Sequence, residues 1–154
     1  MTTYIHRRLG RSNSGSSLSE VPPALFLLIF CAIFPVLNFI MISVTYCSCV
    51  LLNNLELREA ARTPHSQLIP VFLSIQQNWQ ASALGQMAGL AGPPDSDTSY
   101  YVSGGDTYVT VSTIFTAKSL FNIPFFNGIP GLGAPWTYTI SNNRVLEDPS
   151  YASF

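Results

Sequence analysis

Residues 24–52 read ALFLLIFCAIFPVLNFIMISVTYCSCVLL, and no charged residue occurs anywhere between Glu20 and Glu56. About 20 residues of α-helix cross the ~30 Å hydrocarbon core of a bilayer, so this run is long enough with a turn or more to spare. Pro35 removes one backbone donor inside the run, a loss that membrane helices accept where neighbouring groups satisfy the freed carbonyl. The stretch predicts a single transmembrane helix, with the rest of the chain divided between its two sides.

Two kinds of side chain interrupt the apolar pattern of this run. Asn38, in its middle, is either satisfied by a backbone carbonyl or hydrogen-bonded to a partner helix, which makes it a candidate for helix packing. The three cysteines of the chain, Cys31, Cys47 and Cys49, all lie in the run, so no disulfide framework is expected after it. Because Cys47 and Cys49 point to different sides of a helix, we interpret the cysteines as small apolar membrane residues rather than metal ligands.

The composition excludes several functional classes. Only 10% of the residues are charged, against roughly a quarter in an ordinary soluble domain, and the net charge is −1. Without a basic surplus the chain has nothing to neutralise phosphates, so nucleic acid is not an expected partner. A hydrophobic content of 47% also argues against a disordered chain.

The charges on the two sides of the apolar run differ. Before it lie Arg7, Arg8 and Arg11, opposed only by Glu20, whereas the two acidic and two basic residues between positions 56 and 62 cancel. The positive-inside rule therefore predicts a single-pass protein of the inner (cytoplasmic) membrane, with its N-terminus in the cytoplasm and everything after residue 52 outside. The run is about twice as long as the apolar core of a signal peptide and has no small-x-small cleavage site, so we expect it to be retained.

The first 20 residues, MTTYIHRRLGRSNSGSSLSE, form a basic leader with nothing to bury. One interpretation is a disordered tail whose arginines contact anionic membrane lipid. The other follows from Gly15 and Glu20, because the leader resembles that of type IV prepilins, in which cleavage follows a glycine and a glutamate stands at the fifth mature position. This resemblance implies processing by a prepilin peptidase between Gly15 and Ser16, and a partner for Glu20 at the amino terminus of a neighbouring subunit.

The apolar helix is predicted to continue beyond the membrane. Asn53–Arg62 is rich in helix formers, so we expect one rod from about residue 24 to Arg62, with Pro22–Pro23 interrupting its start and Pro64 ending it. Glu59 and Arg62 are three positions apart and can pair, which makes them further candidates for helix packing.

A second helix is predicted from about Gln67 to Leu90, with Pro70 in its first turn. Apolar residues recur along it at helical spacing: Leu68, Val71, Phe72, Ile75, Trp79, Leu84 and Met87. We interpret this stripe as core rather than as a ligand groove.

A small antiparallel sheet is predicted in the last third of the chain. Three segments are rich in β-branched and aromatic residues: Thr98–Val102, Asp106–Ala117 and Trp136–Val145. Gly104–Gly105 predicts a tight hairpin, and we expect 107–117 to pair with 136–145 while a helix covers one face. The predicted fold class is α+β, divided into a basic leader (1–20), the transmembrane helix with its extension (21–63) and a small exported domain (64–154).

Two segments invite a binding-site interpretation. The loop 122–135 lacks the lysine of a phosphate-binding loop, and its surroundings predict packing on the sheet or contact with the membrane surface through Phe121, Phe125, Phe126 and Leu132. Three aspartates near the predicted strands lack EF-hand spacing, so we interpret them as solvated turn residues: Asp95, Asp97 and Asp106. His6 and His65 have no nucleophile poised beside them in the sequence, so no catalytic residue, metal or cofactor is expected.

The order of these features is similar to that of the TadE/TadG-like minor pseudopilins of tight-adherence (Flp, type IVb-like) pili. Glu20 resembles the carboxylate that precedes the helix in that family, and residues 57–62, LREAAR, resemble its helix end. Residues 107–120 with Ile123-Pro124 and Ile129-Pro130 resemble its strand and following loop, and Arg144 and Glu147 stand where its last strand closes.

The resemblance implies a structural, non-enzymatic subunit that takes part in assembly of a Tad/Flp-type pilus or a related secretion filament. Its partners would be membrane lipid, other pilins or pseudopilins, the inner-membrane pilus platform and a prepilin peptidase. The alternative is a single-pass membrane subunit of another cell-envelope complex, with an extracytoplasmic docking domain.

Overall fold

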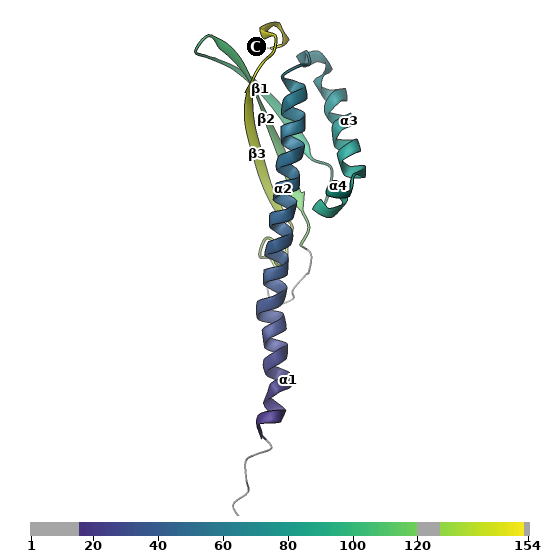
Figure 1. The fold of residues 1–154 in the computed structure, drawn as a ribbon, viewed down its shortest axis with the longest axis vertical. Coiled ribbons are helices and arrows are strands. Elements are labelled where there is room, and N and C mark those ends of the chain that lie inside the picture. Colours follow the sequence, from purple (N-terminus) through teal and green to yellow (C-terminus); the bar gives the residue numbers. More distant parts are fainter. Residues whose placement is uncertain (1–15, 120–126, 153–154) are drawn as a thin grey trace, which may run out of the picture.

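The computed structural model describes residues 16–119 and 127–152, with side chains from Val21 onward. A long helix enters a small α+β head, which consists of Thr45–Ala60 of that helix together with residues 61–119 and 127–152 (Figure 1). The predicted fold class is confirmed. We call the part of the helix that lies below the head, Val21–Leu37, the stalk.

The long helix begins earlier than expected. α1 (Ser16–Leu28), a π-helical turn (Ile29–Ile33) and α2 (Phe34–Ala60) follow one another directly. Pro22 and Pro23 lie inside α1, so the expected interruption there is wrong. Inside a helix, a proline removes a backbone donor and its ring crowds the carbonyl four residues back, yet α1 runs through both prolines.

The π turn ends two residues before Pro35 and accommodates the proline within the helix. The N–H of Phe34 donates to the carbonyl of Ile29, five residues back, instead of the usual four. A wider turn gives the proline ring room beside the preceding carbonyls, with which it would clash in a regular α-helix.

The second predicted helix is two helices. After a short 3₁₀ turn (His65–Gln67), α3 runs over Leu68–Ala81 and α4 over Ala83–Ala88. Ser82 has an extended backbone, and its hydroxyl accepts a hydrogen bond from the N–H of Gly85, so it caps α4 and separates the two. The prediction of one continuous helix is therefore wrong.

The three strands form one antiparallel sheet in the order β1 (Asp95–Ser103), β2 (Asp106–Ala117) and β3 (Trp136–Val145). The predicted bounds of β2 and β3 and their pairing are confirmed, from Tyr108 opposite Val145 to Ala117 opposite Trp136. The hairpin is confirmed as well, because Gly104 and Gly105 connect β1 to β2 with φ of 64° and 93°. β1 begins three residues earlier than expected, so Asp95 and Asp97 are strand residues rather than turn residues.

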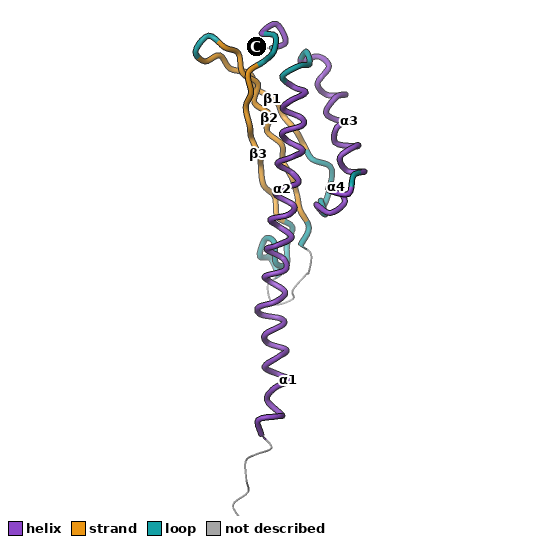
Figure 2. The backbone as a smooth tube through the Cα atoms, viewed as in Figure 1, coloured by secondary structure: helices purple, strands orange, loops and turns teal. Residues whose placement is uncertain are grey.

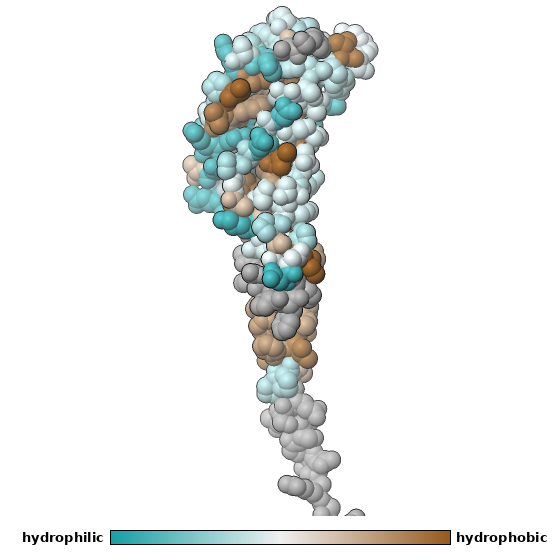
Figure 3. Space-filling model, turned by 180° about the vertical axis from the view of Figure 1, so that it is seen from behind, coloured by the Kyte–Doolittle hydropathy of each residue, from teal (hydrophilic) through white to brown (hydrophobic). Residues whose placement is uncertain are grey.

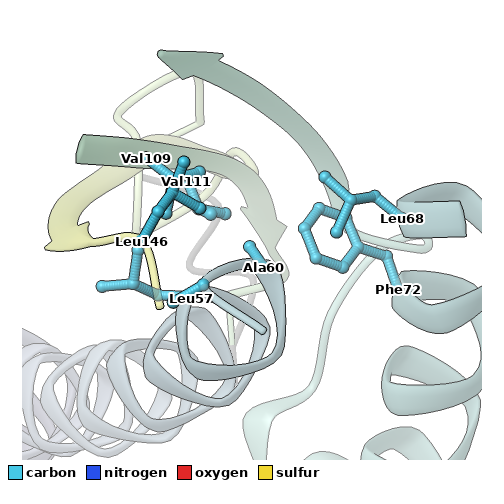
Figure 4. Close-up of a cluster of buried hydrophobic side chains, with 8 residues drawn as sticks. Leu57, Ala60, Leu68, Phe72, Val109, Val111 and Leu146 are labelled. Atoms are coloured by element: carbon cyan, nitrogen blue, oxygen red, sulfur yellow. The ribbon is translucent and has the colours of Figure 1, made fainter. Parts of the chain in front are cut away.

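Two apolar clusters hold the helices on one face of the sheet. The upper cluster, farther from the stalk, joins α2, α3 and β2 through residues that include Leu57, Ala60, Phe72 and Val109 (Figure 4). The lower cluster lies nearer the stalk and contains Cys49, Leu52, Trp79, Ala88, Phe115 and Ile140. Leu84 and Met87 are exposed, because α4 takes a new direction at Ser82, so the predicted core stripe ends at Trp79.

Among the described residues, one helix is long and apolar enough to cross a membrane, Val21–Ala60. The described stalk is mostly apolar in colour, whereas the head is largely polar (Figure 3). The upper half of the helix belongs to the head, since Thr45, Ser48 and Cys49 are buried against it. Thr45–Leu52 of the apolar run therefore pack within the head.

The loop before β3 lies beside α2 at the stalk end of the sheet (Figure 2). Gly131 approaches the helix so closely that a Cβ at this position would lie 2.5 Å from Cδ1 of Ile42. Residues 127–135 therefore pack on the helix as well as continuing into the sheet. Phe121, Phe125 and Phe126, for which packing on the sheet or contact with the membrane surface was expected, lie outside the described residues.

Candidate functional site

The stalk presents an apolar surface on all sides. Every residue from Val21 to Leu28 is exposed, and the large side chains are about half exposed, among them Leu25 and Phe26 at 53% each. The stretch has no charged group. A helix that is apolar all round is suited to lipid or to a bundle of similar helices, because exposing so much apolar surface to water is unfavourable.

Of the three residues predicted for leader processing, Gly15 lies outside the described residues. Ser16 and Glu20 both belong to α1, which is described from Ser16 onward.

Asn38 directly follows the stalk and is only 1% exposed. The side chain is thus covered within the chain, at the level where the helix meets the head. Of the two interpretations of this residue, a bond within the chain fits the burial better than a bond to a separate partner helix.

Glu59 and Arg62 do not pair with each other as suggested. Nε of Arg62 lies 2.6 Å from Oε1 of Glu147, which follows β3. This hydrogen bond raises the pKa of the Arg62 guanidinium above its usual value, with a smaller contribution from the charge of Glu147. The N–H of Glu147 also donates to the carbonyl of Ala61, so the end of α2 is fastened to the end of the sheet.

A polar layer separates the two apolar clusters of the head. Its centre is Glu56 of α2, which is fully buried. The carboxylate accepts hydrogen bonds from Gln76 of α3 at 2.8 Å, from Ser96 of β1 at 2.9 Å and from Thr113 of β2 at 2.7 Å. One side chain of the long helix thereby binds three other elements, α3, β1 and β2.

Asn53 is the second member of this layer and is also fully buried. Its amide donates to the carbonyls of Val111 on β2 at 3.1 Å and Ile140 on β3 at 3.3 Å. Its oxygen accepts a 2.8 Å bond from Asn142. Asn53 thus hydrogen-bonds to backbone carbonyls of two neighbouring strands, and these bonds fix the position of the helix along the sheet.

The sequence interpretation missed the polar layer. It counted Glu56 among charges that cancel on the outer side of the membrane, and it assigned no buried polar role to Asn53 or Thr113. A signal was present: Cys49, Leu52, Asn53 and Glu56 recur at spacings of three and four, so the two polar residues continue the buried face of the helix.

A groove of about 560 Å³ runs between α2 and α3, on the side away from the polar layer. Its lining is mainly apolar, with Leu55, Val71, Ile75 and Leu84 on its walls and Glu59 at its edge. Trp79 lies at its floor and is 6% exposed. The stripe that was interpreted as core therefore forms in part the wall of an open groove.

The described residues contain no group of three or more metal-ligating side chains. Asp106 pairs with Ser103 at the hairpin, while Asp95 pairs with Ile114 far along the same two strands, so the aspartates do not converge. His65 contacts the hydroxyl of Tyr100 at 3.2 Å, and burial raises the pKa of that tyrosine.

Comparison of the chain with family models, with curated proteins and with solved structures found no match.

Proposed function

We propose that this chain is a structural, membrane-anchored subunit of the pseudopilin type, which takes part in assembly of a tight-adherence-type pilus or a related secretion filament. In this role the leader lies in the cytoplasm, the stalk crosses the inner membrane and the head is outside. One observation carries the proposal: the apolar helix continues unbroken from Val21 into the core of an antiparallel head.

The architecture suits a subunit that transmits its position through one helix. The polar layer and the two apolar clusters clamp Thr45–Ala60 to the sheet, so stalk and head move as one piece. The exposed stalk is left free to contact lipid or the stalks of other subunits. A carboxylate at position 20 would stand near the cytoplasmic end of this surface, where a partner amino group would compensate its charge.

The mass of the protein purified from membranes tests the proposal. Processing of the prepilin type predicts an N-terminus at Ser16 when a prepilin peptidase is co-expressed. Gly15→Leu should leave the leader intact, because a bulky side chain obstructs the approach of the peptidase to the backbone. Gly10→Leu is the matched control in the same leader and should be processed normally. An intact leader in the unaltered protein would contradict the pseudopilin assignment.

Crosslinking tests whether stalks associate. Cys31 is exposed on the stalk and Cys49 is buried in the head, so a Cys47→Ser variant leaves one reactive position. A thiol-specific crosslinker should join copies through Cys31 in membranes that contain the assembly machinery. Glu20→Ala should reduce the crosslinked fraction, and a normal yield in that variant would show that the carboxylate does not guide packing.

A second candidate function is a single-pass subunit of another envelope complex with a docking head. The groove between α2 and α3 favours it, because a mainly apolar groove with Glu59 at its edge is suited to binding a segment of another protein. The leader experiment separates the two functions, since only the pseudopilin requires cleavage before Ser16.

A further inference from the structure

The number of helical residues that a bilayer needs sets where the membrane surface lies on this chain, provided that the proposed membrane anchoring holds. Glu20 is the last charged residue before the apolar run. Twenty residues counted from Val21 end at Ile40 and rise about 30 Å, the thickness of the hydrocarbon core. Residues 41–44 then lie at the depth of the outer headgroups, which add roughly 5–7 Å on each side, and the Cα of Tyr46 lies about 9 Å beyond Ile40, at the outer edge of that layer. Helical side chains lean toward the N-terminus, so the ring of Tyr46 extends back toward the headgroups.

The stalk end of the head lies at this depth. Gly131 of the loop before β3 contacts Ile42, and the hydroxyl of Ser119 donates to the carbonyl of Ala134, so the loop is tied to the end of β2. Tyr46, Tyr138 and Trp136 form a row of rings, with centroids 5.6 Å and 5.0 Å apart. These rings lead outward from the helix along the stalk end of the sheet.

The chemistry of this end differs from that of the opposite end. Tyr46 and Ile129 are each 46% exposed, and Lys118 is the exposed charged residue directly after β2. Between Lys118 and Arg144 the sequence has no charged residue. The acidic residues Asp106, Glu147 and Asp148 belong to the far end, and Asp95 pairs with Ile114, three positions above the last pair of β2 with β3.

We propose that this end of the head, formed by Tyr46, Lys118, Ile129 and Trp136, is an interfacial surface that rests among the outer headgroups of the bilayer. Tyrosine and tryptophan rings favour that region, because an apolar ring with a polar edge suits both of its sides. The lysine beside them faces anionic phosphates, and the missing acidic groups remove repulsion. The head thus contacts the lipid headgroups, and this contact fixes how deeply the stalk lies in the bilayer.

The two tryptophans of the chain provide the test. The full-length protein is reconstituted into phosphatidylcholine vesicles whose acyl chains carry bromine either near the headgroup or near the methyl end. Trp79→Phe leaves Trp136 as the fluorophore, and Trp136→Phe leaves Trp79, which is buried in the lower cluster. We expect Trp136 to lose about half of its fluorescence with the shallow bromine and less with the deep one, and Trp79 to be unaffected by either.

Two outcomes overturn the proposal. If neither brominated lipid quenches Trp136, the head lies clear of the membrane. The other outcome is stronger quenching of Trp136 by the deep bromine than by the shallow one. Flotation of the same vesicles reports membrane anchoring separately. Protein that does not float with lipid contradicts the anchoring itself, whereas floating protein with unquenched Trp136 contradicts only the interfacial surface.

A pair of charge variants gives a second readout. Ile129→Asp places a carboxylate in the interfacial surface and should reduce quenching of Trp136 by the shallow bromine at least two-fold, because the carboxylate resists contact with anionic phosphates. Ile114→Asp places the same group on an exposed strand position above it and should leave quenching unchanged. Equal quenching in both variants would contradict the proposed contact.

Discussion

The carboxylate of Glu56 on α2 accepts a 2.7 Å hydrogen bond from the hydroxyl of Thr113 on β2, and both side chains are fully buried. Gln76 and Ser96 complete the set of donors. Within the described part of the chain the one salt bridge joins Arg62 to Glu147, so Glu56 is held by neutral donors. A buried carboxylate held in this way depends strongly on each donor that remains.

Replacement of Thr113 by valine should lower the free energy of unfolding by about 1–3 kcal/mol, because it keeps the shape of the side chain and removes a donor to a buried charge. Thr110→Val is the matched control on the same strand, at a half-exposed position of the opposite face, and should change stability by less than about 0.5 kcal/mol. Urea unfolding of the full-length protein in mild detergent, followed by circular dichroism, measures both. Equal effects of the two variants would show that the bond to Glu56 contributes nothing specific.

Asn53 and its neighbour Asn54 form a second matched pair. Asn53→Ala leaves the amide of Asn142 and two strand carbonyls without their partner, and should cost about 2 kcal/mol or more. Asn54 is exposed on the same helix, so Asn54→Ala should be neutral or stabilising by a few tenths of a kcal/mol through helix propensity. The same unfolding measurement distinguishes them, and a small effect at Asn53 would contradict its role in aligning helix and sheet.

The hairpin between β1 and β2 should respond to loss of its glycines. Gly104→Ala places a side chain at φ 64°, a conformation that costs an L-residue about 1 kcal/mol. Gly92→Ala serves as the control, because a Cβ there meets nothing within 4 Å and the φ lies outside the left-handed region. Thermal unfolding should show a lower midpoint for the first variant and an unchanged or higher one for the second. A midpoint unaffected by Gly104→Ala would mean that this turn does not limit stability.

The ion pair between Arg62 and Glu147 should contribute little. Its side chains are 42% and 53% exposed, and exposed pairs are typically worth 0.2–1 kcal/mol. A double-mutant cycle with Arg62→Gln and Glu147→Gln should therefore give a coupling energy below about 1 kcal/mol that falls further in 1 M salt. A coupling above about 2 kcal/mol, or one insensitive to salt, would show that this contact is part of a stronger network at the end of α2.

The sheet was the most predictable part of the fold. β2 and β3 begin and end at the predicted residues, because an alternation of threonine, valine and tyrosine over ten positions has few competing interpretations. The hairpin followed from Gly104–Gly105 for the same local reason. Their burial confirms the alternation, since Val109, Val111 and Thr113 face the helices.

The helices were less predictable, because apolar spacing records which residues face inward and says little about where a helix breaks. Ser82 and Gly85 lie within a pattern that also fits one continuous helix, and the cap between them depends on the backbone of Ser82. The polar layer was missed for a similar reason. Asn53 and Glu56 resemble the solvated end of a helix until the sheet is placed against them.

The sequence by itself determined that the chain has one uncharged helix able to cross a membrane, followed by a small head with an antiparallel sheet. Only the tertiary structure decided how that helix is shared between membrane and head. The charge-free stretch from Val21 to Leu55 is far longer than the roughly 20 residues that a bilayer needs, so hydropathy allows many positions for the membrane. Packing removes that freedom, because the sheet buries Cys49, Leu52 and Asn53 and leaves Val21–Leu28 exposed.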